Sequence, residues 1–233
     1  MSEAGRWYAG NDEYLVAALA WLRLKLGLLA QQGPVAPRKR AGFFERAEEA
    51  PSPPGEGQVR WAFEAMQAAG ARLQPPPVLW ALGERLGLSP FEGQVLLLCA
   101  AMEFDTRIPE LCNQAHGRSY PTFALALSLF DNPAWDVLSP ERPLRYWRLL
   151  EISQPAAQPL TTSALRADER IVNALKGLHY LDDRLSPLVF PLPTATVALP
   201  PSQQSVAEAA VEYLRRNQEQ QPWPLLELVG PDT

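Results

Sequence analysis

The chain has 233 residues, 47% hydrophobic and 20% charged, which is typical of a globular protein with a substantial core. Its formal net charge of -5 argues against sequence-independent binding of nucleic acid, which needs a surplus of Lys and Arg. The start of the chain lacks the pattern of a signal peptide, and the apolar stretch 14–30 is interrupted by Arg23 and Lys25. We therefore expect a cytoplasmic protein without membrane contact.

The first part of the chain is predicted to hold two helices joined by a linker. Leucines recur at helical spacing over residues 12–31, and further apolar residues on the opposite face call for neighbours on both sides. The linker 33–58 is rich in Pro, Gly and charge and is expected to be flexible. A second helix follows over Val59–Arg72 and ends before the three prolines at 75–77. We therefore divide this part of the chain into three segments. Residues 1–32 form the N-terminal helix, 33–58 form the linker, and 59–77 contain the second helix and the prolines that end it.

Residues 78–190 have the element order of a winged-helix domain. A start signal at Ser89-Pro90-Phe91-Glu92 combines a Ser cap, Pro at the first helical position and Glu three residues after the cap. Two strands of a hairpin are predicted in "RPLRYWRLLEIS" and "QPLTTSALR". The predicted helices are Val78–Gly87, the helix beginning at Ser89 and continuing through "VLLLCAAMEF", Arg107–Ala115, a helix opened by Ser119-Tyr120-Pro121, and Ala167–Lys176. Short helices followed by a two-stranded hairpin indicate a winged helix.

Side chains that could carry chemistry are few. Cys99 and Cys112 lie in apolar helical patterns, so we expect buried free thiols instead of a disulfide. The two histidines, His116 and His179, are isolated from each other and from paired thiols, which predicts no metal site. Carboxylate pairs such as Asp182-Asp183 lack a companion base. The sequence therefore predicts no catalytic residues.

Two groups of polar residues bear on DNA binding. Arg142, Arg145 and Arg148 alternate with Leu144, Tyr146 and Trp147, which would give a wing strand one basic face with aromatic residues between the charges. A later helix of the winged-helix unit carries the polar residues Arg107, Asn113, Gln114, His116 and Arg118, at a place where DNA-binding relatives insert side chains into the major groove. Acidic residues among them (Glu103, Asp105 and Glu110) would repel phosphate. Contact with a protein partner, self-association or simple solvation is favoured over nucleic acid.

The C-terminal region begins with a Pro-rich connector, 191–201. A helix is predicted over Ser202–Asn217, capped by Ser202, with Val206, Ala210, Tyr213 and Leu214 on its buried side. The apolar strand Leu225–Val229 then runs directly into glycine. A strand followed by Gly opens the phosphate-binding loop G-x-x-x-x-G-K-[ST], and its first four positions are matched by Gly230, Pro231, Asp232 and Thr233. An ordinary strand and turn remains the alternative.

The stretch Leu86–Leu185 resembles a known family. Its phrases "LGLSPFEGQVLLLCAAMEFD", "YPTFALALSLF", "PLRYWRLLEI" and "LTTSALRADERIVNALKGLHYLDDRL" are similar to the N-terminal winged-helix region of large bacterial AAA+ ATPases associated with extracellular contractile injection systems, the phage-tail-like particles. Residues 1–75 match less well. The resemblance implies an ATPase module directly after the winged helix, with a phosphate loop beginning at Gly230 and the remaining catalytic motifs beyond Thr233.

Together these observations predict a mainly α fold with a small β-hairpin: a winged-helix domain preceded by helices and followed, over 202–233, by the start of a truncated AAA+ α/β module. The expected function is recognition or assembly for an AAA+ ATPase through protein–protein contacts. We expect no cofactor and no ATPase activity in this fragment, and ATP and Mg²⁺ in the full-length protein. The alternatives are a winged-helix transcription regulator that binds DNA, and a small enzyme whose site is assembled across the fold.

Overall fold

The structure is a computed structural model that describes residues 3–32, 54–178, 185, 188–189, 198–217 and 224–227. The chain divides into two compact units, Met1–Asp182 and Asp183–Thr233, and each is described by itself. Within the described residues, no helix is long and apolar enough to cross a membrane. The predicted mainly helical fold with one small antiparallel hairpin is confirmed.

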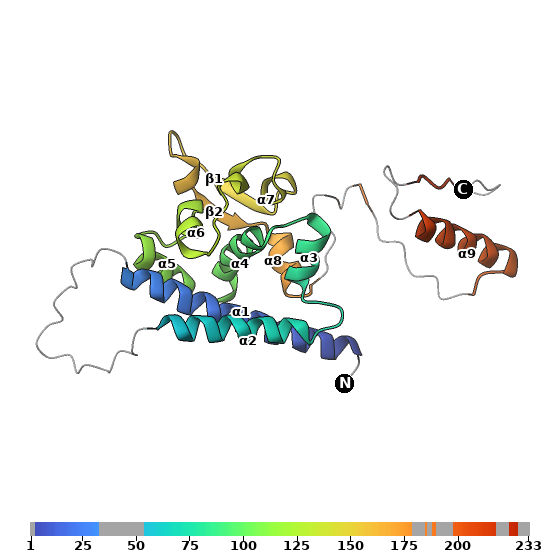
Figure 1. The fold of residues 1–233 in the computed structure, drawn as a ribbon. Coiled ribbons are helices and arrows are strands. Elements are labelled where there is room, and N and C mark those ends of the chain that lie inside the picture. Colours follow the sequence, from blue (N-terminus) through green and yellow to red (C-terminus); the bar gives the residue numbers. More distant parts are fainter. Residues whose placement is uncertain are drawn as a thin grey trace, which may run out of the picture. The chain divides into compact units, whose positions relative to one another are not determined.

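Two long helices, α1 (Glu3–Gln32) and α2 (Glu56–Ala71), lie side by side along one edge of the first unit (Figure 1). The apolar residues of α1 are buried on more than one side because the helix packs against both α2 and α5 (Ile108–His116). The α2 helix begins before the predicted Val59, since the backbone N–H of Gly55 donates to Gln58 Oε1 at its start. At its other end Gly70 lies so close to the Trp80 ring that an added Cβ would approach it to 2.6 Å.

One buried side chain ties the first helix to two other helix ends. Asn11 is 1% exposed, and its Nδ2 donates to the carbonyl oxygen of Leu175 at 2.9 Å. Its Oδ1 accepts the backbone N–H of Val78 at 3.1 Å. Val78 begins α3 (Val78–Leu86) and Leu175 ends α8 (Glu169–Leu175), so one amide satisfies a free donor and a free acceptor at helix termini.

The central helix α4 (Pro90–Phe104) forms the middle of the core, as its run of apolar residues predicts. Ser89 Oγ accepts the Glu92 N–H at 3.2 Å and Glu92 Oε2 accepts the Ser89 N–H at 2.8 Å, so the predicted capping box is present. The start of α6 (Phe123–Leu129) is corrected, because Thr122 and not the Ser119–Pro121 segment caps it, with Thr122 Oγ1 accepting from the Leu125 N–H.

The hairpin is shorter than predicted. Strands β1 (Leu150–Ser153) and β2 (Ala164–Ala167) pair antiparallel, with Leu150 opposite Ala167. The predicted first strand is wrong in its first half, because Pro143 starts a one-turn helix, α7 (Pro143–Tyr146), after the 3-10 turn η1 (Trp135–Leu138). The three alternating arginines therefore do not share a strand face.

The described part of the second unit contains α9 (Pro201–Arg216). Its N-cap is Pro200 and not Ser202 as predicted, since Pro201 at the first helical position sets the start of the helix. None of its side chains is buried within the described structure, and Val206 and Tyr213 of the predicted buried side are exposed. Residues 224–227 have no regular secondary structure, so the first part of the predicted strand is absent there. Its remainder lies outside the described residues.

Candidate interaction surface

The loop of the hairpin carries no charge. It runs from Gln154 to Ser163 with the sequence "QPAAQPLTTS" and includes the turn η2 (Leu160–Thr162). It is fastened to the body by Arg118, which donates from Nη1 to the carbonyl oxygen of Thr162 at 2.6 Å. The Arg118 guanidinium also makes a cation–π contact with the Tyr120 ring, with its Cζ 5.9 Å from the ring centroid. A loop that offers neither Lys nor Arg has no means of neutralising a phosphate backbone.

The polar residues predicted around α5 are largely used within the fold. Figure 1 shows α5 beside α1, and the two helices are in contact. Arg107 makes a two-pronged ion pair with Asp105, with Nε–Oδ1 and Nη2–Oδ2 both at 2.9 Å, while Arg23 of α1 binds the same carboxylate. These hydrogen bonds, those from Arg107 first, hold the pKa of Asp105 well below its usual range against the opposing effect of burial. His116 contributes Nδ1 to the carbonyl oxygen of Cys112 at 2.7 Å.

The first two arginines around α7 also have internal partners. Arg142 Nη2 binds Glu92 Oε2 at 2.7 Å, and its Nε lies 3.4 Å from Asp136 Oδ2. Glu92 is fully buried, so one carboxylate serves both the start of α4 and the start of α7. Arg145 donates to the carbonyl oxygen of Leu138 and so joins α7 to η1. These arginines hold the α7 region together and leave little charge for a ligand.

The end of α7 is exposed and aromatic. Tyr146 is 63% exposed and Trp147 is 47% exposed, with ring centroids 4.8 Å apart and planes at 88°. Trp135 on the neighbouring η1 is 65% exposed. Arg148, the next residue, is exposed, and its side chain has no ion pair or hydrogen bond within the described part of the chain. We call Tyr146, Trp147 and Arg148 the α7 turn.

A family profile described as "Winged helix domain, variant" matches residues 2–189. The chain belongs to this winged-helix family. Searches of curated proteins and of solved structures found no match. In the winged helix the hairpin loop described above is the wing, and α7 is the helical turn that leads into its first strand.

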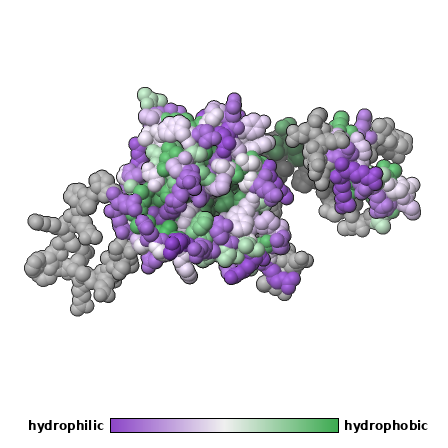
Figure 2. Space-filling model, in the orientation of Figure 1, coloured by the Kyte–Doolittle hydropathy of each residue, from purple (hydrophilic) through white to green (hydrophobic). Residues whose placement is uncertain are grey.

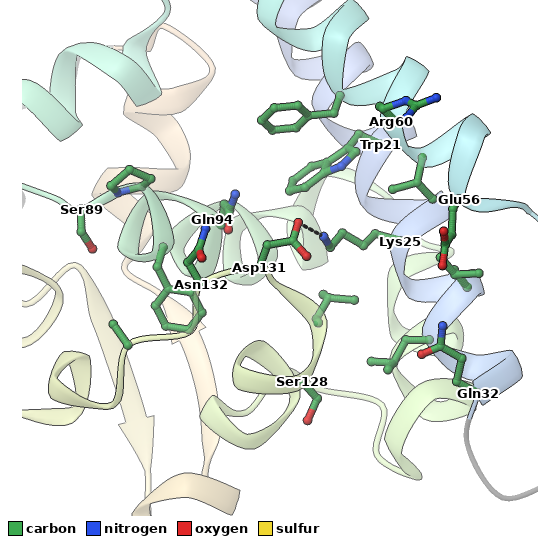
Figure 3. Close-up of a pocket in the computed structure, with 18 residues that line it drawn as sticks. Trp21, Lys25, Gln32, Glu56, Arg60, Ser89, Gln94, Ser128, Asp131 and Asn132 are labelled. Carbon is green, nitrogen blue, oxygen red and sulfur yellow. Dashed lines mark hydrogen bonds and ion pairs between the residues drawn. The ribbon is translucent and has the colours of Figure 1, made fainter.

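The winged-helix unit also has a groove of about 760 Å³ between α1, α2, the start of α4 and residues 128–134 (Figure 3). Its floor includes the Trp21 ring, and Lys25 Nζ meets Asp131 Oδ2 across it at 2.7 Å. Gln94 lines the same space, and its Oε1 is buried without a hydrogen-bond donor from the described residues. In Figure 2, the visible face of the first unit shows hydrophobic residues bordered by hydrophilic ones.

The remaining predicted residues add no reactive site. Cys99 and Cys112 are free and buried as predicted, and burial raises the pKa of both thiols, that of Cys112 to about 12. Among the described side chains, no group of three His, Cys, Asp or Glu is placed to hold a metal ion. Lying outside the described residues are the linker residues 33–53, His179, Asp182, Asp183, the connector residues 191–197 and the loop residues Gly230, Pro231, Asp232 and Thr233.

The residues of the α7 turn were predicted to form part of a possible contact surface, but the conformation of the α7 turn was predicted wrongly. Its residue types were visible in "RYWR", but the alternating pattern suggested a strand, in which Tyr146 and Arg148 would lie on opposite faces from Trp147. The signal that could have separated the two readings is Pro143, which favours the first position of a helix and disfavours the interior of a strand.

Proposed function

We propose that this winged-helix unit recognises a protein partner and has no catalytic role of its own. The observation that carries the proposal is the uncharged wing, Gln154–Ser163, anchored by Arg118. Two further features support it: the arginines 107, 142 and 145 are engaged within the fold, and the exposed residues at the α7 turn are aromatic. Tyr, Trp and Arg are enriched at protein interfaces, whereas nucleic-acid contacts depend on clustered cations.

The more specific proposal is that the unit positions an AAA+ ATPase that serves a contractile injection system. It is supported by the resemblance of residues 86–185 to that family and by the match of Gly230–Thr233 to the start of a phosphate loop. The mechanical work would come from the ATPase module, with ATP and Mg²⁺, and the winged helix would select where that work is applied. If this is right, the residues that follow Thr233 in the parent protein read x-G-K-[ST].

Titration with DNA tests the broader proposal. The full chain is mixed with a labelled duplex of about 20 base pairs, two helical turns, at low salt and again at higher salt. We expect no retention of the duplex in either condition. Tight binding that weakens steeply with salt would contradict protein recognition and favour the DNA-binding regulator.

A further inference from the structure

The backbone at the end of α7 has the geometry of a glycine-terminated helix but has an arginine in the glycine position. The Leu149 N–H donates to the Leu144 carbonyl at 3.0 Å, and the Arg148 N–H donates to the Arg145 carbonyl at 3.1 Å. This pair of bonds is the Schellman motif, in which the residue equivalent to Arg148 adopts a left-handed conformation. Arg148 has φ 51°, inside that region.

The same chain uses glycine where other helices end in this way. Gly87 follows α3 with φ 71°, and Gly177 follows α8 with φ 77°. The corresponding long bonds, Leu88 N–H to the Gly83 carbonyl and Leu178 N–H to the Asn173 carbonyl, are both 2.9 Å. A side chain with a Cβ is disfavoured at positive φ, and Arg lacks the short polar group that helps Asn or Asp there. Arg148 at the end of α7 therefore adopts a backbone conformation that is unfavourable for an arginine.

The left-handed residue directly follows the two exposed rings of the α7 turn. Tyr146 and Trp147 pack edge to face, and Arg148 stands next to them without a partner from the described residues. The other two arginines of this segment, Arg142 and Arg145, already bind Glu92 and the Leu138 carbonyl. The α7 turn thus presents two exposed rings in edge-to-face contact and, at the next residue, an exposed arginine. Strained residues gather at functional sites, and Tyr, Trp and Arg supply most interface hot spots.

We propose that the α7 turn binds a segment of a partner protein in which a carboxylate stands next to an apolar side chain. This inference rests on the proposed function and names its surface and partner class. The free guanidinium pairs with the carboxylate through two parallel N–H bonds, and the apolar side chain packs on Tyr146 and Trp147. Phosphate is disfavoured here because the wing is uncharged and Glu141 and Glu151, both exposed, flank the turn in sequence.

Two capped peptides test the charge complementarity: GELEFEG and its basic counterpart GKLKFKG. Each is titrated into the isotope-labelled full chain while amide, indole and arginine N–H signals are followed by NMR. We expect the acidic peptide to shift the signals of residues 144–149 and the Trp147 indole, and the basic peptide to leave them unchanged. Arg148→Gly should weaken this binding about tenfold. Arg148→Lys should weaken it too, because an ammonium lacks the two-pronged geometry.

Two control variants test whether the loss of any exposed arginine or tryptophan changes peptide binding. Arg85→Ala removes an exposed arginine from α3, and Trp61→Ala removes a 71% exposed indole from α2; neither should change binding of the acidic peptide. Trp147→Ala should weaken it. The Arg148→Gly protein should unfold at a higher urea concentration than the wild type, so its loss of binding cannot be assigned to misfolding.

The outcomes distinguish this inference from the proposed function. Shifts from the acidic peptide that lie elsewhere, or that survive Arg148→Gly, would overturn the inference and leave protein recognition standing. Equal shifts from both peptides, or from neither, would also overturn it. Shifts of the α7 turn by duplex DNA, abolished by Arg148→Gly, would overturn both.

Discussion

Replacement of Arg148 by Gly is expected to stabilise the protein. The residue has φ 51° and is exposed, so the change removes a Cβ from a left-handed position and few packing contacts. Left-handed backbone costs an ordinary residue about 1–2 kcal/mol relative to the right-handed region. Glycine in turn adds conformational freedom to the unfolded chain, which costs about 0.5–1 kcal/mol. The difference is a net gain in unfolding free energy of about 0–1.5 kcal/mol, with a midpoint of about 0.8 kcal/mol.

Urea denaturation followed by tryptophan fluorescence measures this gain, with Arg148→Ala as the matched variant. Alanine removes the same charge and keeps the Cβ, so its unfolding free energy should stay within about 0.5 kcal/mol of the wild type. The converse change, Gly87→Ala, places a Cβ at φ 71° where nothing lies within 4 Å, and should cost about 1 kcal/mol from backbone strain alone. Gly177→Ala should cost more, because its Cβ would lie 2.8 Å from Tyr8 Cε1.

A result in which Arg148→Gly and Arg148→Ala have equal stability would refute this reasoning. It would mean that the end of α7 stores no backbone strain, and that Arg148 carries no conformational cost for binding to offset. A loss of stability in Arg148→Gly would refute it more strongly.

Three further changes probe the fold. Arg142→Ala leaves the fully buried Glu92 carboxylate without its guanidinium, and the urea assay should show a loss of about 3 kcal/mol; a loss no larger than that of an exposed arginine would contradict the pairing. The depressed pKa of Asp105 stabilises the fold above the unfolded-state pKa of about 4, and this contribution should be lost as pH falls below that value. Asp105→Asn should flatten that part of the stability profile, and an unchanged profile would exclude the effect. Cys99 and Cys112, with raised pKa values, should react with a thiol reagent at pH 8 only as fast as the protein unfolds, and immediate reaction in the native state would show that they are accessible.

The sequence was most informative where several local signals agreed. The Ser89-Pro90-Phe91-Glu92 segment predicted both the start of α4 and its capping box, because side chains three residues apart satisfy each other's backbone groups without help from elsewhere. The predicted helix Val78–Gly87 likewise ends at its glycine, because Gly87 adopts a positive φ that glycine tolerates.

The sequence was least informative where the local signals in a short segment favoured two different secondary structures. In "RPLRYWRLLEIS" the alternation favours a strand, while the proline favours a helical turn, and the chain uses both in succession. Tertiary contacts decide the boundary: Leu144 and Leu149 are buried, and Arg142 is fixed by Glu92, far away in sequence. The positive φ of Arg148 follows from that arrangement and has no signature in the residue type, so the sequence predicted these residues as a possible contact face but not their turn conformation.

The Asn11 amide has a consequence for how the chain folds during synthesis. Its carbonyl partner on Leu175 lies 164 residues further along the chain, so α1 cannot complete its contacts until nearly the whole first unit has been made. At about 5–20 residues per second, the wait lasts about 10–30 s. The packing of α1 against α2 and α5 involves residues made earlier, so the contact that waits for Leu175 is the hydrogen bond of the buried Asn11 amide. Deleting α8 should therefore leave the Asn11 Nδ2 without its carbonyl acceptor, and should destabilise the fold without removing the packing of α1 against α2 and α5.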